Sequence, residues 1–253
     1  NPLDPADILH RVWVPGFIIK KYQVTVGDFL VFLNDLVEQG RKEEALAAAP
    51  RERSGMDNAL GALLLGQADD GKFFLQPDTD GDLWEEEWPI LMVDWQCILA
   101  YLSWYSDRTG YKWRLPFSQE WAKSARGVDG RIFSHGDFFD PSWCWTTESH
   151  FEEHTPKSVF NDRLDISPYG VSGMMGNMGD WTASIFKEKQ PQAGEIYEPT
   201  WQPELLVERW FRGGYWSGDT AQCRLTYKQD NRSTLRSWGT SFRLARPFRS
   251  SGE

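Results

Sequence analysis

Large aromatic side chains and glycine dominate this sequence, whereas long periodic apolar runs are few. The chain of 253 residues contains 14 Trp, 15 Phe, 8 Tyr and 22 Gly. A bundle of long helices needs an apolar stripe that repeats about every 3.6 residues, and few segments supply one. The sequence therefore predicts a loop-rich fold in which aromatic residues anchor irregular segments in a common core.

Three segments do carry the apolar spacing and the end signals of helices. Thr25 is followed three residues later by Asp28, which is the pattern of a capping box, and Gly40 can end that helix. Asp94 and Gly110 bracket the second segment in the same way. We expect helices that start after the cap residues Thr25, Asp94 and Ser118.

Strand signals lie at the two ends of the chain. Residues 11–20 are β-branched and aromatic with an interruption at Pro15, and residues 208–216 and 241–248 have the same character. The last two runs bracket a polar segment, 217–238, that we expect to be irregular. Helices followed by strands predict an α+β fold. Residues 41–87 are charged and glycine-rich and are expected to form a helical and hairpin insertion within one domain spanning residues 1–253.

Charge and cysteine usage exclude several classes of function. The net charge of -10 and the pI near 5.0 predict an anionic surface, so we expect no nucleic-acid partner. The three cysteines form no CxxC pair, which argues against structural zinc. No apolar run reaches the roughly 20 residues of a membrane span, and no signal peptide is visible, which leaves the cytoplasm and the cell surface as locations.

Five segments, in order, resemble the formylglycine-generating-enzyme (sulfatase-modifying-factor) family. They are VPGFIIKKYQVTVGDFLVFL from Val14, the block from Pro89 to Gly127 with its Arg-Leu-Pro turn and Glu-Trp helix, SPYGVSGMMGNMGDW from Ser167, FRGGYW from Phe211 and SFRLARP from Ser241. The resemblance implies an α+β fold of the C-type-lectin type, loop-rich, with the N- and C-terminal strands paired and two to three helices.

The sequence motifs of this chain are most similar to those of two branches of that family. One branch is fused to bacterial protein kinases, and the other includes variable proteins of diversity-generating retroelements. The resemblance implies a domain of a larger protein, with a covalently linked kinase domain as one partner. The other expected partner is a protein or small-molecule ligand, because the diversified relatives vary the stretch between their Gly-Gly and Gly-Phe-Arg motifs to bind different ligands.

The resemblance also implies a test for catalysis. The family's enzyme oxidises a substrate cysteine with oxygen, using copper held by two cysteines that follow the Gly-Gly pair. In this sequence Cys223 matches the second cysteine, but Gly218 stands at the first. We therefore expect no copper and no such enzyme. The alternative is a related oxidoreductase, acting on a peptide or thiol, with a non-standard active site around Cys223.

The family has two further branches of enzymes. A three-histidine iron site would need more than the pair His150 and His154, whose segment has no apolar periodicity and is expected to be a solvated loop. A branch that oxidises siderophore precursors leaves no motif to test. For calcium, the family's loop places carbonyl ligands at Gly176 and Met178 and a carboxylate at Asp180, whereas the Asn position is Gly173. Hydrogen bonding within the loop is the competing interpretation.

The polar segment 217–238 is the expected binding surface, because a fixed scaffold that carries an adaptable polar loop is a common recognition design. The predicted ligand-binding residues are Ser217, Asp219, Gln222, Leu225, Tyr227, Gln229, Asp230, Asn231, Ser233, Leu235, Ser237 and Trp238.

Overall fold

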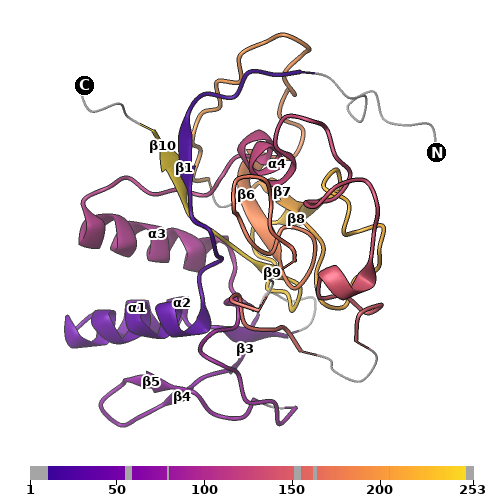
Figure 1. The fold of residues 1–253 in the computed structure, drawn as a ribbon. Helices are drawn as coiled ribbons and strands as arrows, with labels where there is room; N and C mark the ends of the chain where they lie inside the picture. The colour runs from indigo at the N-terminus through magenta and orange to yellow at the C-terminus, as the bar shows by residue number, and fades with distance from the viewer. Residues whose placement is uncertain are drawn as a thin grey trace.

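The two ends of the fold lie side by side. The structure is a computed structural model that describes residues 11–54, 59–78, 80–150, 155–161, 164–204 and 206–248. β1 (Phe17–Ile19) pairs antiparallel with β10 (Ala245–Pro247), as Figure 1 shows. The expected pairing of N- and C-terminal strands is confirmed. The first strand is shorter than residues 11–20, because the chain before Pro15 makes only an isolated bridge from Trp13 to Ile196.

The helices begin where short polar caps allow. Thr25 caps the first helix and forms the expected capping box with Asp28, and Asp94 caps the third by accepting from the Cys97 amide. The fourth helix corrects the prediction by one residue: its cap is Phe117, whose N–H donates to Glu120 Oε2 at 2.9 Å. The helices are α1 (Val26–Glu38), α2 (Lys42–Ala48), α3 (Trp95–Thr109) and α4 (Ser118–Arg126).

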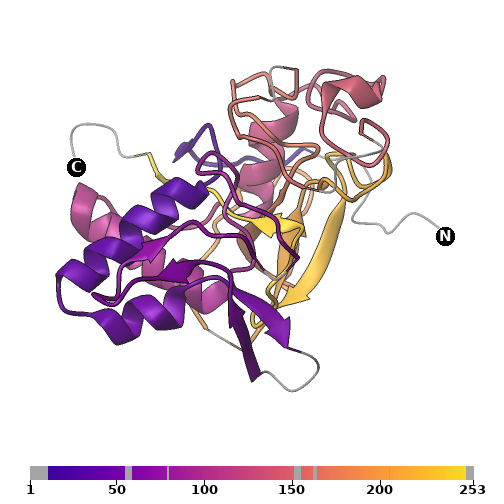
Figure 2. The same ribbon diagram turned by 90° about the horizontal axis from the view of Figure 1, so that it is seen from below.

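A curled sheet of order β8-β7-β6-β9 forms the second half of the fold. Its strands are β6 (Gly179–Ile185), β7 (Glu208–Arg212), β8 (Lys228–Arg232) and β9 (Thr240–Ser241). β6 and β8 flank β7 antiparallel, whereas β9 runs parallel to β6. Figure 2, seen from below, places β7 and β8 on the opposite side of the molecule from α1 and α2. The mixed architecture confirms the predicted fold class.

β8 lies inside segment 217–238, which we expected to be irregular. All five of its residues are polar, so no apolar alternation marks it as a strand. It forms because it occupies the edge of the sheet, where its backbone pairs with β7 over its full length and its side chains remain largely in solvent. The strand therefore depends on backbone pairing rather than on burial.

Residues 41–87 contain α2 and two small hairpins. β2 (Arg51–Ser54) pairs with β3 (Ala59–Leu63), and β4 (Gly66–Gln67) pairs with β5 (Phe73–Phe74). The second hairpin is fixed to α1 by Asn34, whose side-chain amide donates to the Phe73 carbonyl and accepts from the Phe73 amide, at 3.0 and 2.7 Å. The turn at Asp70 and Gly71 agrees with the expected Asp-Gly turn.

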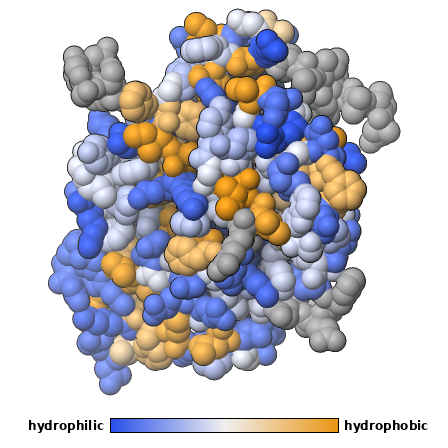
Figure 3. All heavy atoms as spheres, viewed as in Figure 1, coloured by the Kyte–Doolittle hydropathy of each residue, from blue (hydrophilic) through white to orange (hydrophobic). Residues whose placement is uncertain are grey.

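Aromatic anchors hold the two halves together. Trp84, Trp95, Trp121 and Trp181 are fully buried, and the rings of Trp95 and Trp181 meet edge-on at 6.4 Å. α3 contributes one of these rings and β6 the other, so this ring contact joins α3 to the sheet. On the face drawn in Figure 3, apolar side chains lie in separate groups between hydrophilic ones. In the described part of the chain, no helix combines the length and the apolar character needed to cross a membrane.

Candidate functional site

A pocket of about 260 Å³ lies between β8 and the segment that leads into β9. β8 contributes Gln229 and Asn231, which are two residues apart and therefore share one face of the strand. The facing wall comes from the residues before β9. The predicted ligand-binding residues that line the pocket are Ser217, Gln229, Asn231, Leu235, Ser237 and Trp238.

The floor of the pocket is fixed from the helical half of the molecule. Arg236 is buried, and its Nε donates to Asp94 at 3.0 Å while Nη1 donates to the Ala49 carbonyl at 3.0 Å. Asp94 is also the cap of α3, so one carboxylate positions both the helix and the pocket segment. The Met92 amide donates to the Ser237 carbonyl at 3.2 Å. These contacts hold the backbone of residues 235–238 against the core.

Aromatic rings form the rim of the pocket. Trp238 is 38% exposed, and its ring meets the buried Trp84 edge-on at 6.3 Å. Its carbonyl accepts a hydrogen bond of 2.8 Å from Trp216 Nε1. Across the pocket, the Tyr215 hydroxyl accepts from Gln222 Nε2 at 2.8 Å. An exposed tryptophan held by a buried ring and by its own backbone is a pre-ordered anchor of the kind found at recognition sites.

The lining mixes polar and apolar groups and carries no available charge. Arg236 is its only ionisable side chain other than Tyr215, and the guanidinium is already paired with Asp94. Thr240 also lines the pocket, but its hydroxyl oxygen is buried and has no hydrogen-bond partner in the described part of the chain. Amide, hydroxyl and indole groups around a small cavity suit a neutral ligand with hydrogen-bonding groups and an apolar surface.

The other predicted residues lie outside the pocket. Leu225 and Ser233 are buried; Leu225 packs in the core beside Trp121 and the Ser233 carbonyl accepts from the Trp95 amide. Their side chains are not open to a ligand. Leu225 is buried in an apolar cluster, and Ser233 is held against the first residue of α3. Asp230 lies on the opposite face of β8 from Asn231.

Three more predicted residues lie behind the pocket lining and contact it through Tyr215. They are Asp219, Gln222 and Tyr227. Gln222 links the hydroxyls of Tyr215 and Tyr227, at 2.8 and 3.3 Å, and its Oε1 accepts from the Asp219 amide at 3.0 Å. Burial raises the pKa of the Tyr227 hydroxyl above its ordinary value. The three side chains thus support the wall that Tyr215 forms.

Sequence reasoning missed several lining residues. Met92, Phe211 and Thr240 come from three separate segments, and only the fold brings them to the pocket. The backbone of Met92 has a φ of 56°, which is rare for a residue with a side chain. The sequence gives no indication of that conformation.

The residues expected to hold calcium have other partners. Asp180 accepts from Gln23 Nε2 at 2.9 Å, and its second oxygen accepts from Trp121 Nε1 and Arg243 Nε, both at 2.7 Å. The Met178 carbonyl accepts from Gln23 at 2.8 Å. Asp180 and Arg243 are both buried, so this ion pair is shielded from solvent.

Arg243 supplies the positive charge in this loop. Its guanidinium donates to the carbonyls of Lys21, Ser172 and Gly173 at 3.0 to 3.1 Å. Gly176, Met178 and Asp180 therefore do not fit a calcium ion, because a fixed cation already neutralises the carboxylate. Within the described ranges, no group of three or more His, Cys, Asp and Glu residues could hold a metal.

Cys223 has a sulfur neighbour that the sequence did not reveal. Cys144 Sγ lies 4.0 Å from Cys223 Sγ, and both residues are buried. The fold brings these two thiols together from segments that are 79 residues apart.

This pair does not fit the copper site of the resembled enzyme. Gly218 leaves the first position without sulfur, and a Cβ there would lie 2.3 Å from Gln222 Oε1 and 3.0 Å from the Tyr215 carbonyl. The sulfur of Cys144 comes from another loop, and with exposures of 5% and 1% the two thiols present no surface to a substrate cysteine. No catalytic step follows from this arrangement.

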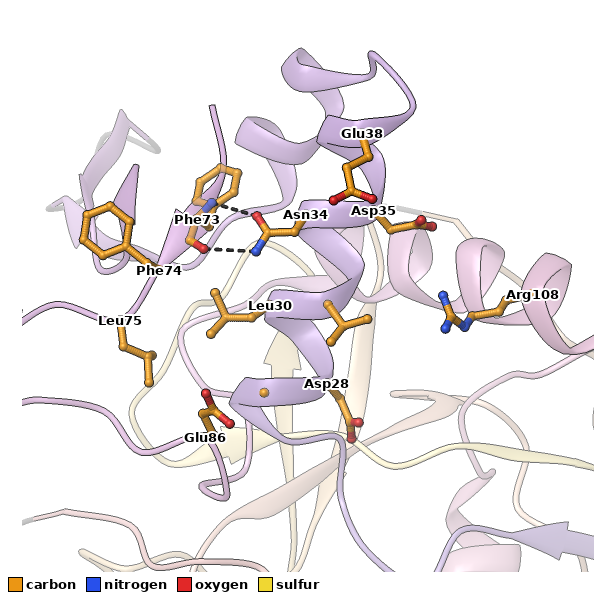
Figure 4. A pocket seen from close by; sticks show the side chains of 12 residues that line it. Asp28, Leu30, Asn34, Asp35, Glu38, Phe73, Phe74, Leu75, Glu86 and Arg108 are labelled. Atoms are coloured by element: carbon orange, nitrogen blue, oxygen red, sulfur yellow. Dashed lines mark hydrogen bonds between the residues drawn. The ribbon is translucent and has the colours of Figure 1, made fainter. Parts of the chain in front are cut away.

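A larger groove, of about 690 Å³, lies between α1 and the β4–β5 hairpin (Figure 4). Its polar groups already have partners in the fold: Asn34 binds the Phe73 backbone, Asp35 accepts from Trp104 Nε1 at 2.5 Å, and Glu38 pairs with Lys72 at 2.7 Å. The contacts of Asn34 and Glu38 fasten the hairpin to α1, and the contact of Asp35 joins α1 to α3. The groove is therefore a packing seam, and the pocket beside β8 is the stronger candidate site.

His150 does not support an iron site. It is stacked on Trp145 with ring centroids 3.8 Å apart, and His154 lies outside the described residues.

The sequence matches a known domain family and several of its members. The profile of the Sulfatase-modifying factor enzyme 1-like domain matches residues 4–248. Inactive C-alpha-formylglycine-generating enzyme 2 of Mus musculus is 28% identical over 262 residues, which cover 93% of this chain and 76% of that protein. Uncharacterized protein YfmG of Bacillus subtilis is 26% identical over 201 residues, which cover 71% of this chain, and the match spans only 36% of YfmG.

A solved structure has the same fold at lower sequence identity. Treponema denticola variable protein 1 superposes with a TM-score of 0.63 and 15% identity, over 93% of this chain and 86% of that chain. This likeness concerns the fold alone.

Proposed function

The chain belongs to the sulfatase-modifying factor enzyme 1-like domain family, and from that premise we propose that it is a non-catalytic recognition domain that binds a peptide or protein through the pocket beside β8. The pocket takes a side chain with a neutral hydrogen-bonding group and an apolar surface. Its volume of about 260 Å³ suits one large side chain better than a whole cofactor.

The observation that carries the proposal is the pocket's construction. Polar side chains of β8 face an exposed Trp238, and the backbone beneath is tied to the core by Arg236. A rigid floor reduces the ordering cost of binding, and a tryptophan at the rim supplies a large contact area.

The similar proteins support a non-catalytic recognition role. The mouse relative is described as inactive, and the Treponema denticola protein is described as variable. Under this proposal the pocket segment is the part of the chain that differs between receptors of one fold, as in the products of diversity-generating retroelements. A kinase-linked sensor domain is the second setting, in which the same pocket reports ligand binding to a covalently attached kinase.

The absence of catalysis in this proposal rests on Gly218 and on the enclosed thiols. Gly218 supplies no sulfur, and the conformation of residues 215–222 leaves little space for a side chain at that position. The alternative, an oxidoreductase centred on Cys223, needs a path for substrate to a residue that is 1% exposed.

A peptide selection tests the proposal. We would select binders from a random peptide library displayed on phage and map one selected peptide by hydrogen–deuterium exchange. We expect slower amide exchange in residues 228–240 and around Tyr215, because a bound peptide shields the pocket and its rim. Protection confined to the α1–β5 groove, or to the sheet face opposite the pocket, would contradict the proposal.

A further inference from the structure

The pair of thiols at Cys144 and Cys223 has no part in the proposed recognition site. Cys144 follows the short helix η2 (Pro141–Trp143), and Cys223 closes the turn of residues 219–222. We infer that these two cysteines are a site of reversible oxidation, where a small-molecule disulfide converts them into an internal disulfide that joins the two loops. This inference is independent of what the pocket binds.

The distance between the sulfur atoms supports this assignment. They lie 4.0 Å apart, which is close to contact, whereas a disulfide bond is about 2.05 Å long. The sulfurs must therefore approach by about 2 Å. Rotation of the two side chains contributes to that approach, and buried cysteines behave as small apolar groups that adapt to their surroundings.

The backbones of the two loops are already tied together. The Thr147 amide donates to the Gly218 carbonyl at 3.2 Å, and the Thr220 amide donates to Glu148 Oε1 at 2.9 Å. Asn177 bridges the same loops, because its amide donates to the Trp145 carbonyl at 2.8 Å and its carbonyl accepts from the Trp216 amide at 2.7 Å. Contacts on both sides of the thiol pair hold the two cysteines in register.

The surroundings of the pair suit the oxidised form. Trp121, Met174 and Met175 belong to the same buried cluster as the two cysteines. A disulfide has no polar hydrogen to satisfy, so oxidation removes two S–H groups from an apolar environment. Oxidation also removes the S–H that Cys223 donates weakly to the Asp219 carbonyl, at 3.4 Å.

The chemistry balances with one co-reactant. Each thiol loses a proton and an electron, the S–S bond forms between Cys144 and Cys223, and the two electrons and two protons reduce a small-molecule disulfide such as oxidised glutathione to two thiols. Exchange proceeds through a mixed disulfide, so one cysteine must first become accessible. Local opening of residues 217–222, whose Ser217 and Asp219 are exposed, provides that access.

Cys97 is an internal control for this reaction. It lies on α3 in the main core cluster, apart from the cluster that holds the other two cysteines. Burial raises the pKa of its thiol to about 12, and Arg236 Nη2 donates to its sulfur at 3.2 Å. Its thiolate is therefore scarce at neutral pH, and we expect it to remain reduced.

The test is incubation of the reduced chain with oxidised glutathione, followed by alkylation and peptide mapping without reducing agent. We expect one linked peptide pair containing Cys144 and Cys223, with Cys97 alkylated only after unfolding. We also expect oxidation to raise the midpoint of thermal unfolding by roughly 5–15 °C, because the bond closes a long loop. Both changes should reverse with dithiothreitol.

Two variants sharpen the result. Cys144→Ser should lose the linked peptide and the thermal shift, whereas Cys97→Ser should keep both. The inference is overturned if all three thiols of the wild-type chain remain free after oxidation, or if the mapped link includes Cys97. Because the mapping uses the wild-type chain, it remains decisive even when a serine variant fails to fold.

Discussion

Replacing Arg243 with methionine is expected to lower the free energy of unfolding by about 3–5 kcal/mol. Arg243 is fully buried and donates to Asp180 at 2.7 Å, as well as to three backbone carbonyls. The substitution leaves the Asp180 carboxylate buried without its compensating charge, and it removes the guanidinium hydrogen bonds to the carbonyls of Lys21, Ser172 and Gly173. Leaving one partner of a buried ion pair uncompensated costs far more than the pair contributes at a surface.

Chemical denaturation of matched variants measures this effect. Arg41→Met removes an exposed ion pair with Glu44, and we expect a change of about 1 kcal/mol or less. Asp180→Asn combined with Arg243→Met should lose less than the sum of the two single changes, because the pair is coupled. A loss below about 1 kcal/mol for Arg243→Met would show that the guanidinium is not the cation of this loop.

Replacing Gly214 with alanine is expected to destabilise the chain by about 3 kcal/mol, or to prevent folding. A Cβ at this position would lie 2.3 Å from the Met175 carbonyl oxygen, which is backbone and cannot rotate away. The Gly214 amide already donates to that same carbonyl at 3.0 Å. The glycine thus lets the loop that leads to the pocket wall approach the loop of residues 174–177.

Gly16 provides the matched control. A Cβ on Gly16 would meet only the Phe248 side chain, at 3.5 Å, which is an ordinary contact distance. We expect Gly16→Ala to change stability by about 0.5 kcal/mol or less. Equal effects of the two alanine variants in thermal and denaturant unfolding would contradict the role assigned to Gly214.

The sequence was informative where local chemistry decides the outcome. The capping residues Thr25 and Asp94 begin their helices as expected, because a side-chain oxygen and a nearby amide are sufficient to define a helix start. The Gly-Gly and Phe-Arg motifs of the last third indicated the fold class, since together with the other segments they identified the family. The pairing of β1 with β10 followed from that resemblance.

The candidate site was predicted in part. The segment 217–238 contains Gln229, Asn231 and Trp238, which do line the pocket. The two faces of that segment cannot be told apart from the sequence, because all five residues of β8 are polar and show no apolar alternation. Leu225 and Ser233 were included for the same reason, although both are buried.

Long-range contacts decided the remaining features. Cys144 approaches Cys223, and Arg243 approaches Asp180, across separations of 79 and 63 residues. Neither spacing has a local pattern that a single sequence reveals. The calcium expectation followed the loop motif around Asp180, whereas the buried arginine that pairs with this carboxylate comes from another segment of the chain.

The most direct test of the recognition site compares the two faces of β8. Using the phage-selected peptide, the dissociation constant should rise at least about 10-fold for Asn231→Ala and for Trp238→Ala, because both side chains line the pocket. Asp230→Ala, on the same strand but on the other face, should change it by about 2-fold or less. A larger loss for Asp230→Ala than for Asn231→Ala, or no change in any of the three variants, would contradict the account.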